Sequence, residues 1–132
     1  MSTNLDIYPT LLDLLDIDIP SDRTIDGNSI LPLITENKDS PHEFVFYNAS
    51  GSGDVVGVRD SIYKYHEGAN GNHLNLMGNW GPAFSLGKQL TNLNLDNEAH
   101  NLIRKYPERA DQLKLIMDNK QKEFEENRRG WL

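Results

Sequence analysis

Apolar residues near the N-terminus recur at the spacing of an amphipathic helix, at Leu5, Leu11, Leu12 and Leu15. Asp6 is a residue type that caps helices, and Pro9 falls in the first turn, where its missing N–H removes no intrahelical hydrogen bond. The pattern predicts a short helix over about residues 6–15, within an N-terminal segment of residues 1–16.

The next segment, residues 17–38, shows no regular period and is interrupted by Pro20, Gly27 and Pro32. We expect an ordered connection there, anchored by Ile25, Ile30, Leu31 and Leu33. The triplet Asp26–Asn28 matches one fragment of a calcium-binding loop, but the alternating acidic ligands and the final glutamate are missing. A turn is therefore expected at this triplet.

Polar and apolar residues alternate in the middle of the chain, and aromatic and β-branched residues are frequent there. This pattern predicts four antiparallel strands near residues 42–48, 55–59, 62–66 and 89–95, the last as an edge strand. A tight turn at Asp60–Ser61 would join the second strand to the third. It would pair Arg59 with Ile62 and Val58 with Tyr63.

The period of two sorts the second and third strands onto two faces. The apolar face would carry Val56, Val58, Tyr63 and Tyr65. The opposite face would carry Arg59, Lys64 and His66, and two interpretations of it stay open. In the first, this face is the solvated side of a sheet whose other side is buried. In the second, it is a patch that binds anions.

Residues 67–88 contain five glycines and four asparagines, which is typical of a long surface loop. Loops of this length are often functional, so this one is a candidate contact region. Trp80 lies within it. Its ring is suited to stacking on a sugar or to packing beneath the loop with Phe84 and Leu86.

A second helix is predicted after the strands, over about residues 107–127. Pro107 stands at a favoured first position, and Ala110, Leu113 and Met117 follow helical spacing. The fold class is therefore α+β. We expect a single domain over residues 1–132, with an antiparallel sheet of about four strands within residues 42–95, a long C-terminal helix against it and a short N-terminal helix.

Composition narrows the possible partners. The chain has 132 residues and a formal net charge of −7, and binding to the phosphate backbone requires clustered Lys and Arg, so no nucleic-acid partner is expected. Its apolar runs are far shorter than the roughly 20 residues of a membrane-spanning helix, so no membrane partner is expected. No signal peptide is visible, and the absence of cysteine excludes disulfides and cysteine nucleophiles.

The histidines do not follow metal-ligand spacing. His66 and His73 are seven residues apart across the expected start of a loop, and His42 and His100 are distant in sequence, so no metal site is predicted. Asn48 begins a glycosylation sequon, which carries weight only in a secretory context.

Five phrases of the sequence, in this order, resemble the C-terminal region of arylsulfatases, and together they cover nearly the whole chain. They are LDIYPTLLDLLDI (5–17), IDGNSILPLI (25–34), SPHEFVFY (40–47), VGVRDSIYKYH (56–66) and LTNLNLDNEAHNLIRKYPE (90–108). The sulfatase family combines an alkaline-phosphatase-like catalytic domain with a smaller C-terminal part. That smaller part is an antiparallel sheet with a long helix against it, which agrees with the elements predicted above.

The resemblance also implies what this chain lacks. Sulfatases use a formylglycine nucleophile made from Cys or Ser in a Cys/Ser-x-Pro-x-Arg motif, together with a calcium ion. The residues two positions before each proline here are Ile7, Asp18, Ile30, Asp39, Trp80 and Lys105. We therefore expect no catalytic residue, metal or cofactor on this chain and no sulfatase activity from it alone.

The resemblance thus implies a C-terminal subdomain that completes a sulfatase catalytic domain supplied in cis or in trans. On that interpretation, the residues that border the substrate pocket would be Arg59, Lys64, His66 and Trp80. The alternative is a stand-alone module, derived from a sulfatase, that binds carbohydrate or protein. Sulfatases are often periplasmic, secreted or lysosomal, and the location of this chain stays open.

The N-terminal helix carries a further expectation from the same resemblance. In sulfatases this helix packs on the catalytic domain, so in the chain alone part of the cover would be missing from Leu11, Leu12, Leu14 and Leu15. We expect the helix either to mediate self-association or to pack against the sheet.

Overall fold

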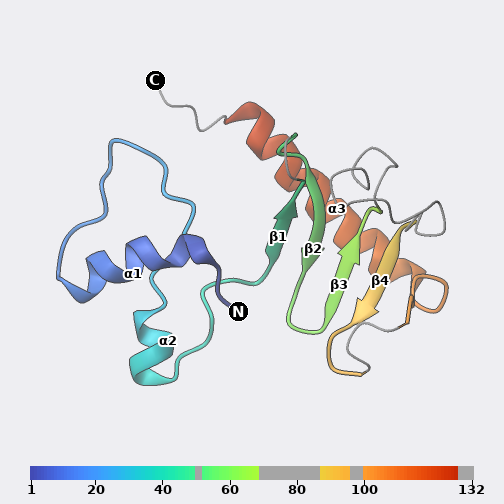
Figure 1. Ribbon diagram of the computed structural model, residues 1–132, viewed down its shortest axis with the longest axis horizontal. Helices are drawn as coiled ribbons and strands as arrows, with labels where there is room; N and C mark the ends of the chain where they lie inside the picture. The colour runs from blue at the N-terminus through green and yellow to red at the C-terminus, as the bar shows by residue number, and fades with distance from the viewer. Residues whose placement is uncertain (50–51, 69–86, 96–99, 128–132) are drawn as a thin grey trace, which may run out of the picture. The chain divides into compact units, whose positions relative to one another are not determined.

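The computed structural model describes residues 1–49, 52–68, 87–95 and 100–127 (Figure 1). These residues form two compact units, and the boundary between them falls between Val45 and Phe46. We call them the N-terminal unit and the sheet unit. None of the helices described is both long enough and apolar enough to span a bilayer.

The N-terminal unit contains a short 3-10 turn, η1 (Asn4–Asp6), and two helices, α1 (Ile7–Leu14) and α2 (Leu31–Glu36). α1 confirms the predicted N-terminal helix. α2 lies in the segment predicted to be a connection, so that prediction was wrong at this point. Pro32 occupies the first turn of α2, where proline is tolerated, and Asn37 ends the helix in a left-handed conformation with φ of 54°.

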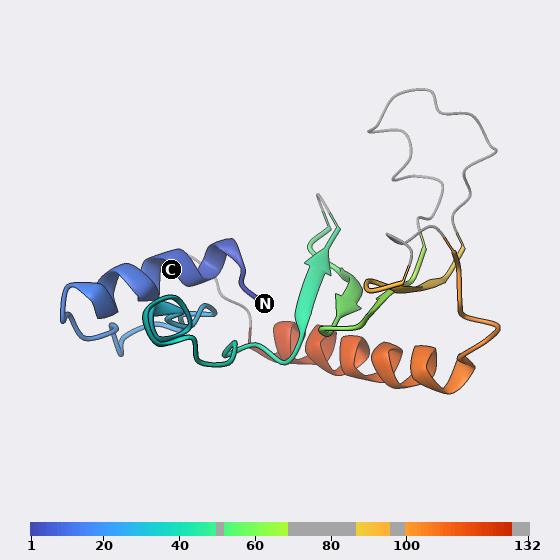
Figure 2. The ribbon, with the colours of Figure 1, turned by 90° about the horizontal axis from the view of Figure 1, so that it is seen from below.

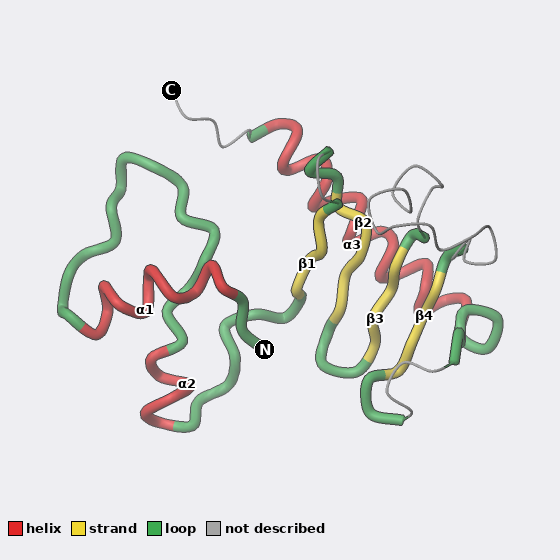
Figure 3. Tube along the Cα trace, viewed as in Figure 1, coloured by secondary structure: helices red, strands yellow, loops and turns green. Residues whose placement is uncertain are grey.

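The sheet has four strands, β1 (Val45–Asn48), β2 (Val55–Arg59), β3 (Tyr63–His66) and β4 (Gln89–Asn92), which neighbour one another in chain order. This confirms the predicted α+β fold with an antiparallel sheet. β4 is shorter than expected because a turn follows it, in which the Asn94 N–H donates to Asn92 Oδ1 at 2.9 Å. Figure 3 shows the four strands side by side.

The predicted register between the second and third strands was wrong by two residues. Arg59 pairs with Lys64 rather than with Ile62, and Val58 pairs with Tyr65. The cause is the Asp60 side chain, whose Oδ1 accepts the N–H groups of Ile62 and Tyr63 at 2.7 and 2.6 Å. A shift of two residues leaves every side chain on the face that the period of two assigned to it.

The long helix α3 (Pro107–Glu126) covers one face of the sheet, as Figure 2 shows. The core lies between them and contains the fully buried Val58, Tyr65, Leu90 and Leu113. Near the other end of the helix, the Gln121 side chain accepts the Val55 N–H at 2.8 Å. The predicted start of this helix at Pro107 and its buried positions are confirmed.

Candidate functional site

The polar residues singled out in the sequence lie together on the sheet face opposite α3. Arg59 on β2 is directly opposite Lys64 on β3, and Lys64 is directly opposite Thr91 on β4. In the neighbouring row, His66 lies between Gly57 and Gln89. Cross-strand partners point to the same side of a sheet. We call the surface formed by Arg59, Lys64, His66, Gln89 and Thr91 the outer face.

Two aromatic rings shape one part of the outer face. The Lys64 ammonium lies 5.4 Å from the centre of the Tyr47 ring, which is within range of a cation–π interaction. A Cβ atom at Gly57 would lie 3.2 Å from His66 Cδ2 and 3.5 Å from Tyr47 Cδ2. Glycine at this position therefore lets both rings approach the backbone of β2.

The hydrogen bonding of His66 fixes its tautomer. Its Nδ1 accepts the Gly68 N–H at 3.0 Å, so the proton of the neutral ring is on Nε2. Burial lowers the pKa of His66, and the positive charge of Lys64 lowers it further against the opposing effect of Glu67. His66 is therefore a neutral donor at physiological pH.

Three of the four residues predicted to border a substrate are brought together by the sheet. Arg59, Lys64 and His66 are each half-buried rather than fully exposed. Trp80 lies outside the described residues. Within the described parts of the chain, no group of three histidines and carboxylates is placed to hold a metal ion.

A second polar cluster, centred on Asp6, organises the N-terminal unit. The Asp6 carboxylate is fully buried and accepts hydrogen bonds from the Thr3 N–H at 2.6 Å and the Asn28 N–H at 3.0 Å. Nε2 of His42 lies 2.7 Å from Asp6 Oδ1. Burial raises the pKa of Asp6, but these N–H groups and His42 outweigh it and hold the pKa below its ordinary value.

The role of Asp6 corrects the sequence analysis. Asp6 precedes α1, but its side chain makes no capping hydrogen bond to that helix. The Asp26–Asn28 triplet, predicted to be a simple turn, supplies the partner: Asn28 donates to Asp6, and Gly27 lies against the backbone of Leu5. A Cβ atom at Gly27 would overlap with the Leu5 carbonyl oxygen, so only glycine fits there.

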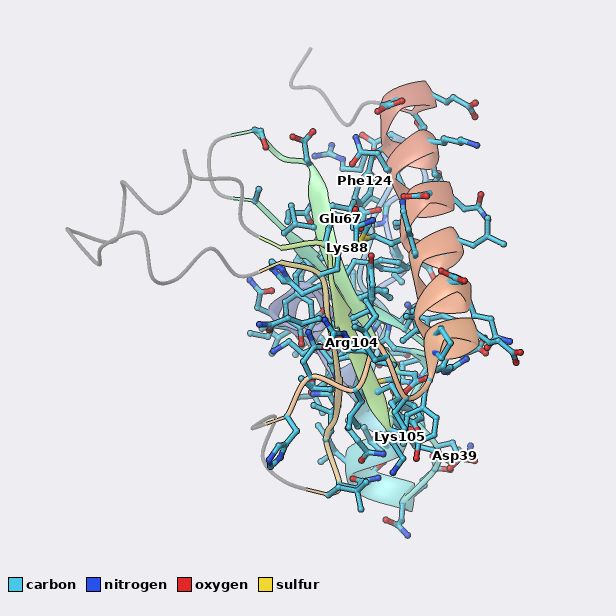
Figure 4. All side chains as sticks on the ribbon, turned by 90° about the vertical axis from the view of Figure 1, so that its right-hand side faces the viewer. Asp39, Glu67, Lys88, Arg104, Lys105 and Phe124 are labelled. Atoms are coloured by element: carbon cyan, nitrogen blue, oxygen red, sulfur yellow. The ribbon has the colours of Figure 1, made fainter. Side chains whose placement is uncertain are left out.

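Charged pairs also border α3. Arg109 of α3 forms an ion pair with Asp60, and its guanidinium lies 5.8 Å from the centre of the Tyr63 ring. At the other end of β3, Lys88 pairs with Glu67 at 2.8 Å, and Figure 4 labels both residues. The Tyr65 hydroxyl donates to Glu67 at 2.6 Å, and burial raises the pKa of that hydroxyl, as does the Glu67 charge. The Arg109–Asp60 pair joins α3 to the turn between β2 and β3, whereas the Lys88–Glu67 pair joins the residue before β4 to the residue after β3.

The N-terminal unit exposes an unusual amount of apolar surface. In the described part of the N-terminal unit, the large apolar side chains that are exposed are those of Leu5, Ile7, Tyr8, Leu11, Leu14, Leu15, Ile17, Ile19 and Ile34. In the described part of the sheet unit the corresponding set is Ile62, Leu95 and Leu115. The expected shortage of cover is seen at Leu11, Leu14 and Leu15, whereas Leu12 is partly covered.

Curated proteins similar to this chain are sulfatases. Rat steryl-sulfatase is 38% identical over 68 residues, which cover 48% of this chain and 12% of that protein. Human arylsulfatase D is 41% identical over 78 residues, which cover 49% of this chain and 13% of that protein. The chain resembles the sulfatase family. The matches are partial, and they are consistent with the C-terminal region that the sequence phrases indicated.

Comparison with solved structures also finds a sulfatase, and this match concerns the fold. A solved Bacteroides thetaiotaomicron sulfatase structure, from work on the metabolism of multiple glycosaminoglycans, has a TM-score of 0.65 with this sulfatase-like chain at 18% identity. The match covers 89% of this chain and 24% of that one, so the same fold occurs there within a larger protein. No family model matches the chain.

Proposed function

We propose that this chain is the C-terminal subdomain of a sulfatase and completes a catalytic domain supplied in cis or in trans. One observation carries the proposal: the N-terminal unit exposes nine large apolar side chains. Its described residues include no buried Leu, Ile, Val, Met or Phe. A surface of this kind marks a place that another part of a protein covers. Sulfatases much longer than this chain are similar to it, which makes the rest of a sulfatase the best candidate for that cover.

The charge of the N-terminal unit defines its partner further. Residues 1–45 contain nine Asp and Glu against two Lys and Arg, so they carry the whole net charge of −7. A surface that is both apolar and acidic is complementary to one that is apolar with a basic rim. The catalytic domain would present that counter-surface.

In this proposal the chemistry belongs to the catalytic domain. The formylglycine and the calcium ion of the family would be held there, and this chain would supply no attacking group. The outer face, with Arg59, Lys64 and His66, would border the substrate pocket, and Trp80 would contribute to the same border. The purified chain is therefore expected not to hydrolyse p-nitrophenyl sulfate. Sulfatase activity that co-purifies with the chain would contradict the proposal.

The decisive experiment is recovery of the chain from its native source with an antibody against the sheet unit, followed by mass spectrometry. The proposal predicts peptides that contain Cys/Ser-x-Pro-x-Arg, in the same polypeptide or in a bound partner. A triple variant, in which Leu11, Leu14 and Leu15 become Ser, should lose a bound partner. The matched control Leu115→Ser, on the exposed side of α3, should retain it.

Two outcomes would count against this function. The first is recovery of the 132-residue chain as a monomer with no sulfatase polypeptide attached. The second is tight binding of a glycan by the monomer with no sulfatase present, which would favour the alternative of a stand-alone carbohydrate-binding module.

A further inference from the structure

A pocket of about 440 Å³ lies at the C-terminal end of α1, within the N-terminal unit. We call it the acidic pocket, and the side chains that line it are those of Asp13, Asp16, Ile17, Asp18, Ile19 and Ser29. The two isoleucines are 51% and 50% exposed. The pocket therefore offers apolar walls as well as carboxylates.

Hydrogen bonds hold both sides of the acidic pocket in place. On one side, the Ser29 hydroxyl donates to the Asp13 carboxylate. On the other side, the Asp16 N–H donates to the Asp13 carbonyl at 3.1 Å, and the Ile17 N–H donates to the Leu12 carbonyl at 2.9 Å. Both walls are thus positioned by contacts within the chain, so a ligand would meet a pocket that is already formed.

The fold alone does not explain the charge of the acidic pocket. The C-terminus of a helix carries a partial negative charge, which favours nearby Lys and Arg and disfavours nearby Asp and Glu. The last turn of α1 contains no basic residue. Asp16 and Asp18 follow that turn, and neither carboxylate has an ion-pair partner among the described residues.

The basic side chains of the N-terminal unit are paired elsewhere. Residues 1–45 contain only two, Arg23 and Lys38. Arg23 pairs with Asp22 at 2.8 Å, and Lys38 pairs with Glu36 at 2.8 Å. The described residues of this unit therefore do not supply the cation that would balance the acidic pocket.

The lining of the pocket favours a long organic cation over a metal ion. In the parts of the chain that the structure describes, no three histidines and carboxylates are placed to hold one ion together. Lysine and arginine side chains pack an apolar stem on apolar surface and keep the charged end among polar groups. Ile17 and Ile19 provide such a surface beside Asp16 and Asp18.

We propose that the acidic pocket receives an arginine side chain of the partner that covers the N-terminal unit. The stem of this arginine lies against Ile17 and Ile19, and its guanidinium donates hydrogen bonds to Asp16 and Asp18. Arginine is favoured over lysine because its fork of N–H groups serves two carboxylates at once. The inference rests on the proposed function and deepens it, because this arginine belongs to the basic rim of the catalytic domain.

An NMR titration of the complete 132-residue chain tests the pocket. N-acetyl-arginine amide is added at constant ionic strength, and N-acetyl-citrulline amide, which has nearly the same shape without the charge, is the control ligand. The proposal predicts saturable shifts of the backbone amide signals of residues 16–19 and of Ser29 with the arginine ligand alone. Exposed ion pairs are weak, so saturation is expected at roughly millimolar concentrations.

Matched double variants locate the binding. Asp16→Asn with Asp18→Asn should weaken binding of the arginine ligand about five-fold or more, because two charge-assisted hydrogen bonds are lost. Asparagine tolerates the left-handed backbone of Asp16, whose φ is 55°, so this variant should keep its fold. Asp39→Asn with Glu43→Gln removes the same charge from two exposed positions outside the pocket, and it should change the affinity less than about two-fold. The amide spectrum of each variant verifies its fold.

Three results would overturn the proposal. They are equal shifts with the arginine and citrulline ligands, equal affinity of the two double variants for arginine, and saturation of the same amides by calcium chloride at a lower concentration than by arginine. The last result would identify a metal site instead.

The titration uses the chain alone, so its result does not depend on a catalytic domain. Failure to recover a catalytic domain would overturn the proposed function and leave a measured arginine pocket standing. Absence of arginine binding would overturn the pocket, and it would leave the proposed function to be decided by that recovery.

Discussion

The sheet unit buries apolar side chains between its strands and α3, whereas the N-terminal unit buries a carboxylate. In the sheet unit the buried apolar residues are Val55, Val58, Tyr65, Leu90, Ala110, Leu113 and Met117. In the described part of the N-terminal unit the buried residues are Asp6, Pro9 and Gly27. The first unit is built as small domains usually are, around a hydrophobic core.

The two units therefore differ in the interactions that stabilise them. A hydrophobic core contributes roughly 25 cal/mol for each Å² of apolar surface removed from water. The N-terminal unit gains little from that source, because eight of its leucines and isoleucines are exposed and none is buried. Hydrogen bonds around Asp6 define its local geometry, and each contributes only about 1 kcal/mol net. In the proposed function, the catalytic domain would supply the missing apolar burial.

The largest expected effect concerns the core of the sheet unit. Leu113→Ala should lower the free energy of unfolding by about 2–5 kcal/mol, since the side chain is fully buried. Leu115→Ala, on the same helix but 62% exposed, should change it by less than about 0.5 kcal/mol. Urea unfolding monitored by circular dichroism measures both. Equal losses for the two variants would show that α3 does not stabilise the chain through this core.

The next effect concerns the close approach of Gly27 to Leu5. Gly27→Ala places a Cβ atom against backbone that cannot move aside, and it should destabilise the N-terminal unit by about 3 kcal/mol. Gly87→Ala is the control, because a Cβ atom there meets nothing within 4 Å. Amide exchange of α1 reports the loss. An α1 that exchanges in Gly27→Ala as it does in the unaltered chain would contradict the description of this contact.

Removing the charge of Asp6 should have a smaller effect, about 1–3 kcal/mol in the N-terminal unit. The pKa of Asp6 is lowered in the folded chain. Its stabilisation is therefore complete above the unfolded pKa of about 3.9 and disappears as pH falls through the folded pKa. Amide exchange of Thr3 and Asn28, followed from pH 6 downward, measures this dependence.

Asp6→Asn should abolish that acid dependence, and Asp18→Asn, an exposed residue of the same unit, should leave it in place. If the amide exchange of the Asp6→Asn and Asp18→Asn variants shows the same dependence on pH, the buried carboxylate does not stabilise the unit.

The smallest effect on stability is expected for the exposed surface of α1. Leu14→Ser should change the free energy of unfolding of the chain by less than about 0.5 kcal/mol, because the side chain is 61% exposed. The same change should weaken association with a sulfatase catalytic domain, measured by co-purification. A large loss of stability would mean that α1 is covered within the chain. Self-association that disappears with Leu14→Ser would identify a second copy as the occupant of this surface.

The sheet unit was largely predictable from the sequence, because alternation of side chains assigns faces even when the register is wrong. Val58 and Tyr65 were expected on one face and Lys64 and His66 on the other, and the structure agrees. The register itself depends on the Asp60 side chain, which accepts two backbone N–H groups and widens the turn. Propensity alone does not reveal such a side-chain contact.

The N-terminal unit was less predictable for a related reason. Its order depends on contacts between residues distant in sequence, such as Asp6 with Asn28 and with His42. Asp6 before a helix suggests a cap, and the triplet Asp26–Asn28 suggests a turn. Neither pattern indicates that Asp6 and Asn28 form a hydrogen bond. α2 was missed because Pro32 was interpreted as an interruption rather than as part of a first helical turn.

Residue-by-residue hydrogen exchange of the isolated chain would show whether the N-terminal unit lacks a stabilising neighbour. We expect the amides of α1 to exchange about a hundredfold or more faster than those around Leu113 in α3, because core elements open only with global unfolding. In an assembly with the proposed sulfatase catalytic domain, the exchange of the α1 amides should slow toward the rate of α3. Equal protection of the α1 and α3 amides from exchange in the isolated chain would contradict the proposal that a partner covers the N-terminal unit.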